Sequence, residues 1–115
     1  MAARRASQAL NLIAGLLVCL PASLGAAESD TLALHGKALL QDKCARCHAV
    51  GSTGESSLTQ APPLRDIYAR FSPRELQVRF SEGLASRHKD MPQIQFSDED
   101  TNAILTYLYA LAIRK

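Results

Sequence analysis

The chain is 115 residues long, which suits one domain of ordinary size and excludes a multidomain protein. The chain has thirteen lysines and arginines and eleven aspartates and glutamates, and the excess of two positive charges comes from Arg4 and Arg5. The remainder of the chain is therefore close to neutral, which removes the main electrostatic support for general nucleic-acid binding.

Residues 1–27 have the layout of a secretory signal peptide. A basic start is followed by an apolar run over 10–20, which Pro21 ends, and then by small residues. We expect cleavage after Ala27, or alternatively after Ala26, which leaves 28–115 as the mature domain without stable membrane insertion. The alternative is an uncleaved anchor, because the apolar stretch is nearly long enough to span a bilayer.

A helical pattern follows the leader. The first predicted helix is capped by Asp30 or Thr31 and runs into Cys44. Its inner face consists of Leu32, Gly36, Leu39 and Leu40.

A polar loop and a proline pair at 62–63 precede two further predicted helices. The inner face of the short first one consists of Leu64, Ile67, Tyr68 and Phe71. The second starts at Ser72, which caps it, with Pro73 in first position and Glu75 closing a capping box. Gly83 ends this helix. Its inner face consists of Leu76, Phe80 and Leu84.

The segment 87–96 is expected to be irregular around Met91, and Ser97 is expected to cap a final helix with an acidic first turn. The apolar stripe of that helix consists of Ile104, Tyr107, Leu108 and Leu111. No run alternates with period two for long enough to form a strand. The predicted fold class is therefore all-α, with three to five helices.

Cys44, Cys47 and His48 form a Cys-x-x-Cys-His motif, which is typical of c-type haem attachment. Residues three apart on a helical turn point the same way, so both thiols can add to vinyl groups on one edge of a porphyrin. His48 is then carried beneath the ring, where its imidazole can bind iron. The remaining cysteine, Cys19, leaves with the leader, and the sequence predicts one covalent haem c.

Three other interpretations of the cysteine pair are weaker. A thioredoxin-like redox pair requires a βαβ setting, and no strand is predicted. A structural zinc site requires four ligands, and Cys44, Cys47 and His48 supply three that converge poorly. A plain disulfide is disfavoured by the combination of leader, motif and helical context.

Met91 is the predicted sixth ligand of the iron, because it is the only methionine of the mature chain and does not lie on a helical stripe. A thioether favours ferrous iron and raises the reduction potential. The alternatives are that Met91 is a core residue or that His88 is the ligand. His35 is expected at the surface of the first helix.

The residues around the ligands can also be predicted. A ligating histidine donates its other N–H to an acceptor, and the Pro62 carbonyl is the candidate for His48. Gly36 is expected where the first and last helices cross, because a missing side chain allows close approach. Tyr107 is placed against Gly36 and is counted with the haem-binding residues.

These features resemble class I cytochromes c, most closely the short bacterial monohaem members. The resemblance covers essentially the whole mature chain and implies that the helices wrap around one covalent haem. It implies iron ligation by His48 and Met91, a hydrogen bond to Pro62, and packing of Leu64 on the haem. The matching residues are Gly36, the motif at 44–48, the segment 61–64, Met91, Pro92, Tyr107 and Leu108.

The expected function is one-electron transfer by a periplasmic protein, monomeric or part of a redox complex, with no catalytic residues. Export by the general secretory route is favoured, because haem attachment after crossing requires an unfolded passenger. Alternatives are a subunit of a larger dehydrogenase or oxidase, which exposed Ile94 and Phe96 would favour, and a gas-binding sensor in which Met91 leaves the iron.

Redox partner proteins are the expected partners. A basic patch around the haem edge would steer acidic partners, although a scatter of solvated charges is an equally good interpretation. The residues of this patch would be Lys43, Arg46, Arg87, His88 and Lys89.

Overall fold

The computed structural model describes residues 24–83 and 89–114. This part of the chain contains four α-helices and no strand, which confirms the all-α class. The helices are α1 (Leu24–Lys43), α2 (Leu64–Arg70), α3 (Pro73–Glu82) and α4 (Asp98–Ile113). Most of the predicted leader, together with Leu84, Arg87 and His88, lies outside the described residues.

The predicted start of the first helix is wrong, because α1 begins at Leu24 and not at Asp30 or Thr31. The stretch between Leu24 and Asp30 contains no proline, and Ala26, Ala27 and Glu28 are good helix formers, so the helix is not interrupted before Asp30. Thr31 lies inside the helix, where its hydroxyl donates to the Ala27 carbonyl at 2.9 Å and does not cap. Its other end is as expected, since α1 ends at Lys43 beside Cys44.

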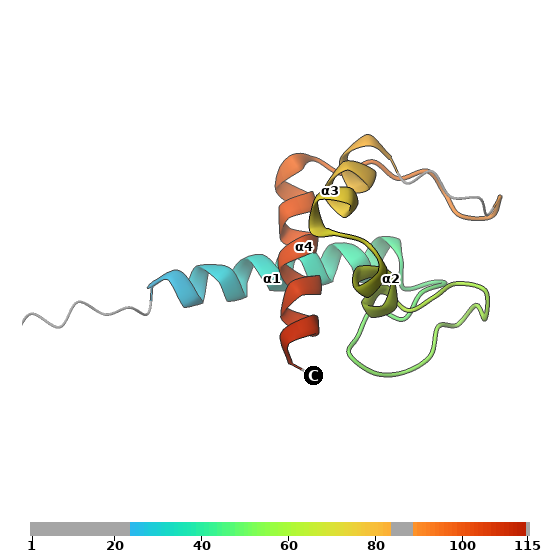
Figure 1. Cartoon of the computed structure of the whole chain (residues 1–115), viewed down its shortest axis with the longest axis horizontal. Coiled ribbons are helices and arrows are strands. Elements are labelled where there is room, and N and C mark those ends of the chain that lie inside the picture. The colour runs from blue at the N-terminus through green and yellow to red at the C-terminus, as the bar shows by residue number, and fades with distance from the viewer. Residues whose placement is uncertain (1–23, 84–88, 115) are drawn as a thin grey trace, which may run out of the picture.

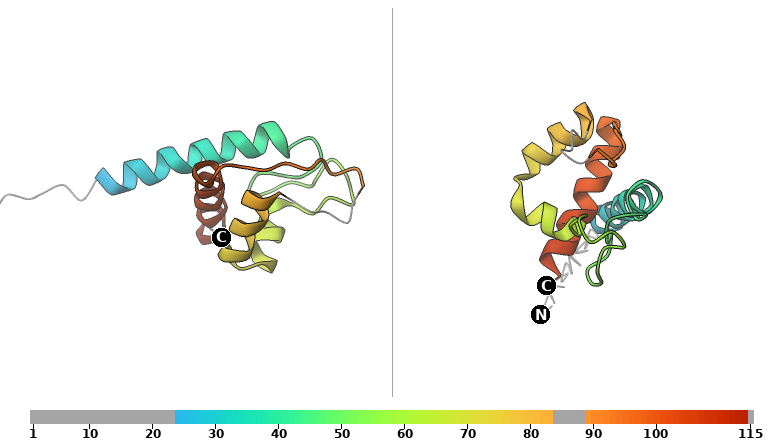
Figure 2. Two further views of the ribbon diagram at one scale, coloured as in Figure 1. Left: turned by 90° about the horizontal axis from the view of Figure 1, so that it is seen from above. Right: turned by 90° about the vertical axis from the view of Figure 1, so that its right-hand side faces the viewer.

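The helices α1 and α4 cross steeply, as the views of the ribbon show (Figures 1 and 2). Gly36 lies at the crossing, where a Cβ atom would overlap the backbone of Ala103 and Ile104. The close approach predicted from the glycine is therefore confirmed. The nearest atoms belong to the backbone of Ala103 and Ile104, about one turn of α4 before Tyr107, and the placement of Tyr107 against Gly36 stays a prediction.

The helices α3 and α4 begin as their sequence signals predict. Ser72 caps α3 and forms a reciprocal capping box with Glu75, while Pro73 occupies the first turn. Gly83 ends α3 with φ at +99°, a conformation that favours glycine. Ser97 caps α4 by accepting a hydrogen bond from the Asp100 N–H.

The core lies between α4 and the other three helices. The Phe80 and Phe96 rings meet edge to face there, with centroids 5.9 Å apart. The most deeply buried large side chains are Leu40, Leu76, Ile104 and Leu108. Within the described ranges, no helix has both the length and the apolarity that a membrane crossing requires.

Candidate haem site

The attachment motif forms a tight turn at the C-terminal end of α1. The Cys44 N–H donates to Leu40 O at 2.8 Å, and the His48 N–H donates to Cys44 O at 2.9 Å. These bonds extend the helical winding by one further turn, so Cys44, Cys47 and His48 are carried on a single turn. This is the arrangement that the motif spacing predicts.

A cavity of about 510 Å³ opens beside this turn. Such a volume falls in the range of roughly 300–1,000 Å³ that is usual for small-molecule and cofactor sites. Its walls come from the attachment turn, the loop before α2, α2 itself and the segment that holds Met91. The described residues that line it are Lys43, Cys44, Arg46, Cys47, His48, Leu58, Gln60, Ala61, Pro62, Ile67, Arg70, Phe71, Asp90, Met91, Pro92 and Ile94.

Most of the residues predicted for the site line this cavity, and two do not. The lining residues are Cys44, Cys47, His48, Pro62 and Met91. Leu64 and Tyr107 lie instead in the buried core, with 6% and 8% of their surfaces exposed. The Tyr107 hydroxyl donates to the Val50 carbonyl at 3.0 Å and so connects α4 to the chain that follows the motif.

Part of the apolar wall could not be predicted from the sequence. Ile67 and Phe71 were predicted on the inner face of the short helix, but that pattern did not show that they face the cavity. Leu58 and Ile94 lie in irregular segments, where no periodicity marks the inward side. Both segments lie on the same side of the molecule, beyond the C-terminal end of α1 (Figure 1).

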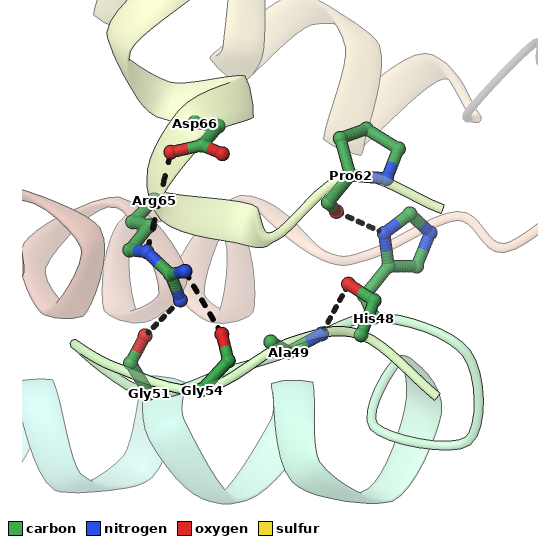
Figure 3. Close-up of polar contacts among 8 residues, drawn as sticks. His48, Ala49, Gly51, Gly54, Pro62, Arg65 and Asp66 are labelled. Atoms are coloured by element: carbon green, nitrogen blue, oxygen red, sulfur yellow. Dashed lines mark hydrogen bonds and ion pairs between the residues drawn. The ribbon is translucent and has the colours of Figure 1, made fainter. Parts of the chain in front are cut away.

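The imidazole of His48 has a fixed orientation. Its Nδ1 lies 2.7 Å from the Pro62 carbonyl oxygen, as predicted (Figure 3). A carbonyl only accepts hydrogen bonds, so Nδ1 carries the proton. Nε2 is then left with a free lone pair, which is the form that binds a metal.

The two thiols are free cysteines, so the plain disulfide is not formed. Burial raises the pKa of the Cys44 thiol to about 11. That thiol therefore stays protonated at neutral pH, whereas the nucleophile of a thioredoxin-like pair needs a lowered pKa. A zinc site also lacks support, because the described residues include no group of three or more His, Cys, Asp or Glu side chains placed to hold a metal ion.

The residues of the cavity match the chemistry of haem c. A porphyrin is a large apolar ring, and Leu58, Ile67, Phe71 and Ile94 supply an apolar wall for it. The two thiols and the oriented imidazole supply the donors for covalent attachment and for one axial ligand. Met91 adds a soft thioether from a segment distant in the sequence.

The comparisons with known proteins agree with this geometry. The family model described as cytochrome c matches residues 33–112, which include the attachment turn, the cavity lining and most of α4. No curated protein and no solved structure matches the chain significantly. The chain therefore belongs to the cytochrome c family, with a covalently bound haem c and its iron as the cofactor.

Proposed function

We propose that this haem-based electron-transfer protein is a periplasmic single-electron carrier in which His48 and Met91 are the axial ligands of the iron. The observation that carries the proposal is the shared cavity, which brings Met91 together with Cys44, Cys47 and His48. When bound, the haem supplies an Fe(III)/Fe(II) couple that takes up or releases one electron. The periplasmic location is supported by the signal-peptide layout of residues 1–27.

In this proposal each side chain has a limited task. Cys44 and Cys47 hold the porphyrin through thioether bonds, and His48 binds the iron through Nε2 while Nδ1 donates to Pro62. The Met91 thioether stabilises the ferrous state and so raises the reduction potential. The apolar wall keeps water from the ring, which further tunes the potential.

The Met91 assignment is tested by replacing the residue in two ways. Met91→Ala removes both sulfur and volume, and Met91→Leu removes the sulfur while retaining a similar volume. Both should lower the potential by something on the order of 0.1 V, within the range of about 0.8 V that axial ligands span. Both should also allow the reduced protein to bind carbon monoxide rapidly.

The unsubstituted protein provides the contrast, since Met91 should make its carbon monoxide binding slow. Rapid binding by that protein would favour the gas-sensing alternative. An unchanged potential in the Met91→Leu variant would show that Met91 only packs against the ring.

A free carrier is better supported than a permanent enzyme subunit. The subunit alternative was tied to exposed Ile94 and Phe96, but Phe96 is only 7% exposed and packs against Phe80. Ile94 is half-buried and faces the cavity. Purification of the exported protein under mild conditions should therefore yield it without a stoichiometric second chain.

The charges beside the cavity support docking to an acidic redox partner. Arg46 and Arg70 line the cavity and are exposed, and Lys89, two residues before Met91, is exposed too, whereas Asp90 adds an exposed acid to the lining. Lys43 contributes less net charge, because its ammonium lies 2.8 Å from the Asp42 carboxylate. Electron transfer to an acidic partner should slow as salt rises, and a rate independent of salt would exclude steering by these charges.

A further inference from the structure

The loop between the attachment turn and α2 must present the Pro62 carbonyl to His48, although the loop is mostly exposed and contains no helix. Two cross-links join its two ends. His48 Nδ1 donates to Pro62 O at 2.7 Å, and the Leu64 N–H donates to Ala49 O at 3.0 Å. Both cross-links lie close to the haem-binding turn. Farther out in the loop, Ser56 Oγ accepts from the Ala49 N–H at 2.9 Å, and the Leu58 N–H donates to Cys47 O at 3.2 Å.

Arg65 supplies a further cross-link (Figure 3). One guanidinium amino group donates to Gly54 O at 2.8 Å, and the other donates to Gly51 O at 3.4 Å. The Asp66 carboxylate lies 4.0 Å from Nε of the same side chain. Only 18% of the Arg65 side chain is exposed, so it lies against the loop and not in solvent.

The geometry requires an arginine and a glycine. The planar guanidinium directs two amino groups at two different carbonyls, whereas a lysine ammonium is a single point of charge on a flexible stem. Gly54 has φ at +87°, a conformation that favours glycine, and this turn brings its carbonyl to Arg65. The three cross-links follow one another along the chain, from His48–Pro62 through Ala49–Leu64 to the Arg65 contacts.

We propose that Arg65 is a positioning residue for the axial imidazole, and this inference rests on the proposed ligation of the iron by His48. By holding the Gly51 and Gly54 carbonyls, Arg65 fixes the outer loop against the start of α2. The Pro62 carbonyl, three residues before Arg65, is thereby kept on His48 Nδ1. A hydrogen bond from Nδ1 to an acceptor that stays in place makes the imidazole a more basic ligand.

The substitution Arg65→Gln tests this role through two readouts at His48. Exchange of the His48 Nδ1 proton with solvent should become faster by about ten-fold or more, because the loop opens more often. The reduction potential should rise, since a less basic imidazole stabilises ferric iron less. Neither readout would change if Arg65 contributed only to global stability, provided that both are measured well below the unfolding transition.

Three further variants make the result specific. Arg74→Gln removes an exposed arginine from α3 and should leave both readouts unchanged. Arg65→Lys keeps the charge without the planar guanidinium. Its proton exchange and reduction potential should therefore stay close to those of Arg65→Gln. Gly54→Ala strains the turn while its Cβ meets no atom within 4 Å, so it should reproduce the effect of Arg65→Gln. In the double variant Arg65→Gln/Gly54→Ala, the change in each readout should be smaller than the sum of the changes in the two single variants.

Two results would overturn the proposal. One is that proton exchange and potential are unchanged in Arg65→Gln. The other is that Arg65→Lys has the exchange rate and potential of the unsubstituted protein, which would show that only the charge matters. Iron ligation by His48 is read separately, from hyperfine-shifted imidazole signals in the ferric unsubstituted protein. Absence of those signals would refute the proposed ligation itself, independently of Arg65.

Discussion

Tyr107 connects the last helix to the chain that leaves the attachment turn. Its hydroxyl donates to the Val50 carbonyl at 3.0 Å, and both residues are buried. Burial also raises the pKa of the Tyr107 phenol, so the hydroxyl remains a donor through the neutral pH range. Its role in this structure is thus to hold the haem-binding segment against α4.

Tyr107→Phe should lower the free energy of unfolding by about 1–3 kcal/mol, because it leaves a buried carbonyl without its donor. Denaturant unfolding followed by far-ultraviolet circular dichroism measures this change. Tyr109→Phe is the matched control, since Tyr109 is 56% exposed and its loss of a hydroxyl should change stability by less than about 0.5 kcal/mol. Equal effects of the two substitutions would contradict the assigned hydrogen bond.

At the scale of elements, the crossing of α1 and α4 depends on a missing side chain. Gly36→Ala should reduce the free energy of unfolding by about 3 kcal/mol or more, because the new Cβ overlaps the backbone of Ala103, and backbone cannot move aside as a flexible side chain can. Gly51→Ala is the control, since its Cβ would meet only ordinary contacts. Comparable stability of the two variants in urea would show that the helices do not meet at Gly36.

A second link between the same helices should make stability depend on pH. His35 Nε2 lies 2.9 Å from Asp100 Oδ1, and this hydrogen bond, with a further one from Ser97, holds the pKa of Asp100 below its usual value. A lowered folded-state pKa means that the stabilisation is present above about pH 4 and is lost as pH falls through the folded value.

Asp100→Asn should therefore be less stable than the unsubstituted protein at pH 6, and the difference should shrink below pH 4. Parallel thermal unfolding at both pH values measures this difference, and effects common to both proteins cancel. A difference that stays constant from pH 6 to pH 3 would show that the Asp100 carboxylate makes no such contribution.

For the molecule as a whole, local signals in the sequence were sufficient for both ends of α3 and for the start of α4. Ser72, Glu75, Gly83 and Ser97 act through contacts within a few residues, so their caps could be predicted without knowledge of the fold. The start of α1 was not predicted, because the N-cap preference of Asp30 and Thr31 does not prevent a helix from continuing through these residues.

The candidate site was predictable to the extent that its chemistry is local. The Cys-x-x-Cys-His turn follows from its own spacing, and the Pro62 acceptor follows from the need of a ligating histidine for a partner. The apolar wall from Leu58 and Ile94 depends on how two irregular segments fold over the turn, which periodicity does not reveal. The Arg65 contacts with Gly51 and Gly54 were missed for the same reason.

Covalent attachment of the haem is tested most directly by the mass of the exported protein, measured after unfolding in acid. We expect the mass of residues 28–115 plus one haem, which is retained covalently on the peptide that contains Cys44 and Cys47. A polypeptide mass without the haem, with the pigment released into the acid, would contradict covalent attachment.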